Sequence, residues 1–352
     1  MSEFWQAEAR FDWERYIDEN GAIRALRGRK DEYLMGCPDC GKPKLAVNIT
    51  RRAWRCFSCG DGGRDATSLV AKVEALLWHE AMARVLSGCE AVIGQLDQLK
   101  ALEVDSAARP ASWVPRVRAY PESYEPVGPQ SPAGMMGVQY CLQRGIPVYV
   151  AQEMRLGVCS RGRFRGRLMF PVFDSGGRLI FYQGRATWQP HARERHIKTL
   201  SPRTDTETGE AGAGDVLLNL AYVAAKDCQR VVVTEGPIDC AHAWPDAVAT
   251  FGKNISPRQI ELLMRAGIRE LDLCFDNDPA RRAPDGRLLP GGSEAMMKAA
   301  PVLADLFTVR VVRLPVGKDP GDLTKDEIDQ YRDQATVWGS GDRLQSIPYT
   351  LS

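Results

Sequence analysis

The segment VVVTEGPIDC at residues 231–240 places an apolar, β-branched run directly before an acid, Glu235, with a second acid, Asp239, four residues later. Valine-rich runs of this length favour buried strands, so the segment predicts a strand over 230–234 that ends at Glu235. A carboxylate at the end of so apolar a strand needs an explanation, and two similar segments elsewhere in the chain provide one.

Two further acidic groups follow apolar segments. Asp276 and Asp278 come directly after the apolar run 271–275, and Asp319 and Asp322 follow a later one. Catalytic groups in open α/β sheets gather at the carboxyl ends of the strands, so we expect these acids to meet at one edge. Several acids without nearby bases cannot all stay ionised unless a cation joins them, and oxygen ligands suit Mg²⁺ or Mn²⁺. A single DxD pattern is more often a surface turn, so the prediction depends on all three groups.

The order of the expected elements defines the fold class. Strands alternate with helices in the second half of the chain, which predicts an α/β parallel sheet within a protein that is α+β overall. The expected strands are 168–173, 179–183, 230–234, 248–251, 271–275 and 309–313, with helices near 257–266 and 293–306. Residues 1–30 and 66–86 also have helical apolar spacing, whereas six prolines between 104 and 134 predict a linker.

Two cysteine pairs predict a metal site. Cys37 and Cys40 form one C-x-x-C pair, and Cys56 and Cys59 form another after fifteen intervening residues. Four thiolates in two such turns match the tetrahedral coordination of a structural Zn²⁺, with no position left for a catalytic water. Unligated thiols are the alternative reading.

Basic residues beside an aromatic side chain separate the two cysteine pairs. We expect a hairpin, 45–49 with 53–57, that carries Arg51, Arg52 and Trp54. Cations next to an aromatic ring suit single-stranded nucleic acid, because bases stack on the ring and phosphates pair with the cations. The alternative is that Trp54 packs inside a small core and the arginines are only solvated.

A strongly basic block lies within a chain of almost neutral net charge. The 352 residues carry a formal net charge of +1, yet 155–203 holds eleven basic residues and two acids. Such a local excess predicts a polyanion-binding surface. The chain has no apolar run of the roughly 18–20 residues that span a bilayer, and it does not begin like a secretion signal, so we expect a cytoplasmic protein.

Taken together, these motifs resemble those of the DnaG-type DNA primases of bacteria and their phages, over about residues 34–325. EGPID at 235–239 resembles the glutamate motif of the TOPRIM fold, and DND at 276–278 resembles its DxD motif. GKDPGDL at 317–323 is similar to a later acidic motif, although Gly321 stands where many relatives have an aspartate. The segment RFRGRLMFPVFDSGGRLIFYQGR at 163–185 resembles the basic subdomain signature of the family, which is far more specific than the TOPRIM motifs.

The resemblance implies a nucleotidyltransferase, a DNA-directed RNA polymerase that makes short RNA primers from ribonucleoside triphosphates on single-stranded DNA. It implies Glu235, Asp276 and Asp278 as ligands of Mg²⁺ or Mn²⁺, with Asp239, Asp319 and Asp322 as further catalytic acids. It implies nucleic-acid or nucleotide contacts from two groups of basic residues: Arg165, Arg167, Arg185 and Lys198, and less specifically Lys253 and Lys318. Expected partners are the template, the RNA–DNA product and a replicative helicase, in a bacterial or phage-infected cytoplasm.

The corresponding domain plan has five parts. We expect a zinc ribbon with flanking helices at 1–90, a linker at 91–133, a basic subdomain at 134–228, a TOPRIM subdomain at 229–325 and a tail at 326–352. Two alternatives share some of these motifs: a non-catalytic, RecR-like DNA-binding protein of recombination or replication, and a TOPRIM nuclease. Neither alternative explains the basic signature together with the zinc ribbon.

Overall fold

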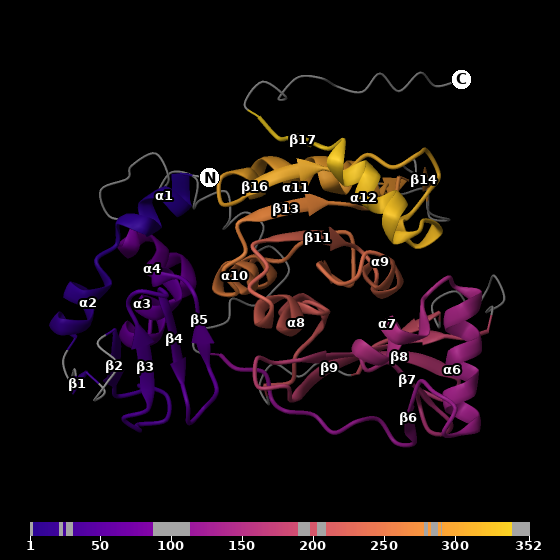
Figure 1. Cartoon of the computed structure of the whole chain (residues 1–352), viewed down its shortest axis with the longest axis horizontal. Coiled ribbons are helices and arrows are strands. Elements are labelled where there is room, and N and C mark those ends of the chain that lie inside the picture. The colour runs from indigo at the N-terminus through magenta and orange to yellow at the C-terminus, as the bar shows by residue number, and fades with distance from the viewer. Residues whose placement is uncertain are drawn as a thin grey trace.

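Three modules make up the described part of the chain in the computed structural model (Figure 1). The structure describes residues 3–20, 24–25, 31–86, 113–188, 198–202, 209–277, 281–282, 288–289 and 291–339. We call residues 3–86 the cysteine module, 113–202 the antiparallel module and 209–339 the parallel module. Each contains one five-stranded sheet, and the mixed α+β architecture expected from the sequence is confirmed.

The cysteine module is an antiparallel sheet with two pairs of short helices. Helices α1 (Glu3–Arg10) and α2 (Trp13–Glu19) precede it and α3 (Ala66–Glu74) and α4 (Trp78–Val85) follow it. The strands pair in chain order: β1 (Arg24–Ala25), β2 (Glu32–Met35), β3 (Leu45–Asn48), β4 (Ala53–Cys56) and β5 (Gly62–Gly63). The β3–β4 hairpin confirms the prediction.

Two helix predictions in this module need correction. Residues 24–25 form strand β1 and not a helix, because they pair with β2. The helix expected over 66–86 is interrupted, since Ala75 takes a left-handed φ of 55° that ends α3 before α4 begins. Apolar spacing alone did not reveal either change, because both helices keep the same buried face.

The antiparallel module has the strand order β10-β9-β8-β7-β6. Its elements are β6 (Tyr124–Pro126), α6 (Pro132–Gln143), α7 (Val148–Glu153), β7 (Gly157–Cys159), β8 (Arg167–Phe173), β9 (Leu179–Ala186) and β10 (Thr199–Leu200). Within the expected linker 91–133, Tyr124–Pro126 form strand β6, which pairs with β7, and α6 begins at Pro132. Prolines in this stretch fall at the end of an edge strand and at a helix start, where they are tolerated.

The parallel module brings the acidic segments to one side. Its sheet order is β12-β11-β13-β16-β17, with β12 (Ala247–Ala249), β11 (Arg230–Thr234), β13 (Glu270–Leu273) and β16 (Thr308–Val311) parallel and β17 (Thr336–Val337) antiparallel. The connections carry α9 (Pro237–His242), α10 (Pro257–Arg265) and α11 (Gly292–Ala304), as expected for right-handed crossovers. The remaining elements are η3 (Ala213–Asp215), α8 (Leu220–Ala225), β14 (Arg281–Arg282), β15 (Leu288–Leu289), η4 (Pro320–Asp322) and α12 (Lys325–Asp333).

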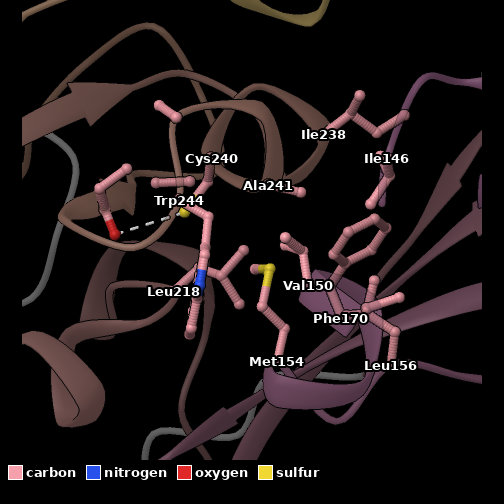
Figure 2. Packing of buried hydrophobic residues seen from close by; sticks show 14 of the residues in the cluster. Ile146, Val150, Met154, Leu156, Phe170, Leu218, Ile238, Cys240, Ala241 and Trp244 are labelled. Carbon is pink, nitrogen blue, oxygen red and sulfur yellow. Dashed lines mark hydrogen bonds between the residues drawn. The ribbon is translucent and has the colours of Figure 1, made fainter. Parts of the chain in front are cut away.

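The antiparallel and parallel modules share one hydrophobic core. Figure 2 shows Val150 and Phe170 of the first module lying toward Ile238 and Ala241 of helix α9. Phe170 and Ala241 are at most 1% exposed. Burial of this apolar area, at about 25 cal/mol per Å², fixes the basic sheet against the helix that carries Asp239.

The cysteine module is held to the parallel module by a buried ion-pair network. The side chain of Arg265, at the end of α10, is 9% exposed and pairs with Asp61, and its guanidinium also donates to the Gly62 carbonyl at 3.0 Å. Lys72, 1% exposed, bonds Asp61 at 2.8 Å and also pairs with Asp39. Burial by itself raises the pKa of Asp61, but Arg265 and Lys72 bring it below its usual value. The network thus connects both cysteine turns to α10.

Apolar contacts extend the same interface. Phe4 and Trp5 of α1, with Met82 of α4, belong to the core cluster that covers α10, α11 and the face of the parallel sheet beneath them. Among the described residues, no helix is both long enough and apolar enough to span a membrane.

We expect Arg265→Met to destabilise the protein by about 3 kcal/mol, because it removes one of the two cations, Arg265 and Lys72, that compensate the buried Asp61 and breaks the link between Asp61 and α10. Urea unfolding and hydrogen exchange of the α10 amides would measure the loss. Arg15→Met is the matched control, since Arg15 pairs with Glu19 in an exposed position and should not shift the midpoint. An Arg265→Met midpoint equal to that of the wild type would show that the network does not hold the two modules together.

Candidate functional site

Three carboxylates from three different connections meet at the carboxyl edge of the parallel sheet. Asp239 lies in the first turn of α9, Asp276 follows β13, and Asp319 precedes η4. One carboxylate oxygen from each lies within 4.8 Å of the other two. We call these three residues the acidic triad. Its oxygen donors suit a divalent cation such as Mg²⁺ or Mn²⁺.

The triad concentrates negative charge in a half-buried place. Burial raises the pKa of Asp239 well above its usual value, and the charges of Asp276, Asp319 and Glu235 raise it further. Burial also raises the pKa of Asp319, and Asp322 adds to this effect, whereas Arg144 opposes it. Like charges this close cannot all ionise without compensation, which a bound cation would supply.

The predicted metal ligands are only partly grouped in the structure. Glu235 is 8% exposed and lies at the end of β11, near the triad but outside the set of mutually close oxygens. Asp278 lies outside the described residues. Asp322 is exposed, and its carboxylate accepts a long hydrogen bond of 3.4 Å from the backbone N–H of Asp319. Asp239 and Asp319, which the resemblance had given a supporting role, occupy the centre of the cluster instead.

Two glycines make room for this arrangement. A Cβ on Gly292, at the start of α11, would lie 2.4 Å from Glu235 Oε1 and 2.3 Å from the Asp276 carbonyl. A Cβ on Gly321 would lie 2.9 Å from Asp239 Oδ1 and 3.1 Å from Asp319 Oδ1. The absence of a side chain at Gly321 therefore lets the η4 loop close onto the triad.

Asn277 ties together the two loops that carry Asp276 and Asp319. Its amide donates to the Leu314 carbonyl at 2.6 Å, and its backbone N–H donates to the Lys318 carbonyl at 2.9 Å. The sequence analysis gave no role to this middle residue of DND. The position of Asn277 between two acids could have indicated a structural role, because a side-chain amide there can donate a hydrogen bond to a neighbouring loop without adding charge.

Cations border the triad on two sides. Arg144, at the end of α6, comes from the antiparallel module and acts electrostatically on Asp319. Sequence reasoning missed it, because only tertiary packing brings α6 to the acidic edge. Lys318 is exposed on the loop just before Asp319, and Lys253 is half-buried after β12, so both predicted lysines lie near the carboxyl edge.

The basic block does not form a single surface. Arg185 pairs across the sheet with Leu168, whose face packs against the parallel module, whereas Arg167 pairs with Ala186 on the opposite face. Arg167 is 5% exposed, and Arg165 and Lys198 are exposed. Arg167 is therefore not available as a surface phosphate contact, since its guanidinium lies 5.1 Å from the centre of the Trp188 ring.

Two predicted contacts in the cysteine module are also corrected. Trp54 is 3% exposed and its indole N–H donates to Ser68 Oγ at 2.9 Å, so its ring cannot stack on a base. Arg52 is turned inward, where its guanidinium donates to the Phe11 carbonyl and lies 5.4 Å from the Trp13 ring centre. Arg51 is exposed, as expected. The exposed aromatic residue of this hairpin region is Phe57, 69% accessible, which lines a cavity of about 570 Å³ between the cysteine and the other two modules.

The four cysteine sulfurs converge as predicted. Cys37 Sγ lies 3.9 Å from Cys59 Sγ, and Cys40 Sγ lies 3.7 Å from Cys56 Sγ. These separations suit a tetrahedral Zn²⁺ with Zn–S bonds of about 2.3 Å. Burial by itself raises the pKa of Cys56, but backbone N–H groups of Cys59 and Ser58 lower it to about 7, which prepares a thiolate ligand.

Comparison with known proteins gives a consistent result. No protein-family model matches the chain. A DNA primase of Pseudomonas aeruginosa is 25% identical over 326 residues, which cover 81% of this chain and 46% of that protein. A DNA primase of Deinococcus radiodurans is 26% identical over 309 residues, with coverage of 80% and 51%. This chain is similar in sequence to bacterial DNA primases.

The sequence similarity to primases covers most of this chain but only about half of each primase. The chain spans about half the length of the curated primases that it matches. Among solved structures, the zinc-binding and RNA polymerase domains of the Aquifex aeolicus primase give a TM-score of 0.46 at 20% identity, covering 96% of this chain and 86% of that one.

We expect Asp239→Asn to raise the melting temperature at neutral pH in metal-free buffer. The folded-state pKa of Asp239 lies above 3.8, so its contribution to stability is present at low pH and is lost as the pH rises through the raised value. The variant should therefore gain stability at pH 7.5, and little near pH 3.5. Thermal unfolding in EDTA measures the effect, with the exposed Asp333→Asn on α12 as control. With excess Mg²⁺ the wild type should have the higher melting temperature, since only the wild type keeps all three carboxylates of the triad. A lower melting temperature for Asp239→Asn than for the wild type in EDTA would contradict this account.

We expect Cys56→Ser to abolish binding of one zinc equivalent per chain, because serine does not supply the thiolate at this pH. A colorimetric zinc assay after denaturation would measure the metal content. Cys141→Ser provides the control, since Cys141 is buried in the antiparallel module, far in sequence from the cysteine cluster. Retention of a full zinc equivalent in Cys56→Ser would show that the four sulfurs are not the ligands.

Proposed function

We propose that this protein is a DNA primase, which polymerises ribonucleoside triphosphates into short RNA primers on a single-stranded DNA template. The observation that carries the proposal is the acidic triad, a cation site bordered by Arg144 and Lys318, in a chain similar to DNA primases over four-fifths of its length. Phosphoryl transfer depends mainly on positioning and charge neutralisation, and this edge of the sheet offers groups for both.

The residues at this edge have distinct tasks in the proposed reaction. Asp239, Asp276 and Asp319 would hold Mg²⁺ or Mn²⁺, and Glu235 at the end of β11 would be a further ligand. Asp278 is proposed as another ligand from its place in the sequence alone. When bound, the ions activate a 3′-hydroxyl and neutralise charge on the leaving pyrophosphate. Arg144, Lys318 and Lys253 supply positive charge to the triphosphate, while Asp322, exposed on the η4 loop, raises the negative potential near Asp319.

The other modules would bind the nucleic acids. Arg185 lies on the sheet face that packs against the parallel module, so it is the member of the basic block placed to contact a strand near the triad. Arg165 and Lys198 lie where a template or RNA–DNA product can reach them. The cysteine module, folded around one structural Zn²⁺, presents Arg51 and Phe57 to a single strand. A replicative helicase in a bacterial or phage-infected cell is the proposed protein partner. The proposed domain boundaries are 1–90, 91–133, 134–228, 229–325 and 326–352.

Incorporation of labelled ribonucleotides on a library of single-stranded DNA templates tests the proposal. We expect the wild type, with Mg²⁺ or Mn²⁺, to produce short RNA on a subset of templates. Asp276→Asn should lower the rate by at least about 100-fold, because it removes a charge that must hold the metal during transfer. The exposed Asp333→Asn should remain fully active.

The alternative functions predict different products. Shortened templates without RNA synthesis would indicate a nuclease, and single-strand binding without either product would indicate a non-catalytic binding protein. Either result, obtained with zinc-loaded and correctly folded protein, would overturn the proposal.

A further inference from the structure

An exposed tryptophan stands on the outer side of the basic sheet. Trp188 follows β9 directly and is 43% exposed. Large aromatic rings at the surface of a charged region need a reason, because burying the ring would be favourable. The sequence analysis gave this residue no role, and it lies on the side of the sheet away from the acidic triad.

The tryptophan ring is supported from below by a buried arginine. The guanidinium carbon of Arg167 lies 5.1 Å from the Trp188 ring centre, and Arg167 is only 5% exposed. Its guanidinium donates to the Lys198 carbonyl at 3.4 Å, and among the described residues no carboxylate pairs with it. Burial lowers the pKa of Arg167, as expected for a cation without an anionic partner.

The loop before β8 is shaped to fit the same ring. Gly166 has a φ of +68°, and a Cβ there would lie 3.0 Å from Trp188 Cζ3. The neighbouring Thr187 donates to the Gly166 carbonyl through both its hydroxyl, at 2.7 Å, and its backbone N–H, at 3.2 Å. Any other residue at 166 would be strained and would press on the ring, so the position of Trp188 is set by the fold.

Exposed cations surround this position. Arg163 and Arg165 lie on the loop that ends at Gly166, and Lys198 lies beside Arg167. Arg163 donates to the Ser201 carbonyl at 3.2 Å and covers the ring of Phe164. In the described part of the chain, neither Arg163 nor Arg165 forms an ion pair. The patch therefore combines an accessible aromatic ring with the positive charge of Arg163 and Arg165, which no carboxylate of the described residues neutralises through an ion pair.

We propose that Trp188 is a stacking platform for an unpaired base of single-stranded nucleic acid. The ring stacks on the base, Arg167 strengthens the stack from the other side as a cation–π partner, and Arg165 and Lys198 contact the adjacent phosphates. A duplex would not use the platform, because its bases are already stacked on each other. The inference deepens the proposed function by naming a ligand and its mode of binding, yet it requires binding only and no polymerisation.

The platform lies on the face of the sheet opposite to Arg185. A strand bound at Trp188 is therefore held outside the space between the antiparallel and parallel modules. Contacts on the two faces can act on one continuous strand that passes the sheet edge, so the platform would anchor template at a distance from the triad. Its contribution is to affinity and positioning, and Trp188 is not a catalytic residue.

Fluorescence anisotropy with two labelled oligonucleotides tests the platform. One is an oligo-dT strand, and the other is an abasic strand of equal length and charge. Trp188→Ala should weaken oligo-dT binding about 10-fold or more, because a base–aromatic stack contributes about 1–3 kcal/mol. Trp188→Phe, which keeps an aromatic ring, should recover most of the affinity, and the abasic strand should bind the wild type and Trp188→Ala equally.

Salt dependence separates stacking from charge. Trp188→Ala should leave the slope of log affinity against log salt unchanged, whereas Arg165→Gln should reduce it by about 0.7, the loss of one phosphate contact to a single strand. Tyr149→Ala is the matched control, since Tyr149 is also exposed, at 64%, but lies on α7. It should bind both strands like the wild type.

Three results would overturn the platform: unchanged oligo-dT binding in Trp188→Ala, an equal loss for the abasic strand, or a loss in Trp188→Phe as large as in Trp188→Ala. Circular dichroism confirms that the variants are folded. The platform and the proposed function can fail separately. A base-dependent loss in Trp188→Ala without any primer synthesis by the wild type would uphold the platform alone, and primer synthesis with unchanged binding in Trp188→Ala would uphold the function alone.

Discussion

Repulsion among half-buried carboxylates is the constraint on which the parallel module depends. Asp239, Asp276 and Asp319 come from three separate connections and share a site where burial, together with the charges of Asp276 and Asp319, raises the pKa of Asp239. Such an arrangement persists only if each loop is fixed independently. Asp239 bonds the Gly236 N–H at its own helix start, and Asn277 fastens the Asp276 loop to the Asp319 loop. The concentrated negative charge that destabilises the metal-free fold would favour a bound cation for the same electrostatic reason.

The hydrophobic core between the antiparallel and parallel modules gives this edge its cations. Packing of Phe170 and its neighbours against α9 places the end of α6, with Arg144, beside Asp319. His242 reinforces the same junction, since its two ring nitrogens lie 2.7 Å from the carbonyls of Leu323 and Arg144. The parallel module supplies the acids and the two lysines at this edge, Lys253 and Lys318, whereas Arg144 comes from the antiparallel module.

Buried charged side chains join the cysteine module to the parallel module. Arg265 and Lys72 reach the acids that flank the two cysteine turns, so the metal ligands and the interface are neighbours in one network. Buried ion pairs add little net stability compared with apolar packing, but they are demanding in geometry. They therefore fix one orientation of the module, and with it the direction in which Phe57 and Arg51 face.

The sequence by itself was sufficient to predict the strands of the parallel sheet and the two kinds of site, the acidic edge and the cysteine cluster. The β-branched run before Glu235 and the mostly apolar run before Asp276 were sufficient to predict these two parallel strands, because strands that are buried on both faces have an apolar composition. The spacing of Cys37, Cys40, Cys56 and Cys59 predicted their convergence, since two C-x-x-C turns suit only a few geometries. Only the tertiary structure decided which acids are closest, that Trp54 faces inward, and that Arg167 and Arg185 lie on opposite faces. Those outcomes depend on register, packing and loop closure between residues far apart in the chain, which local patterns do not encode.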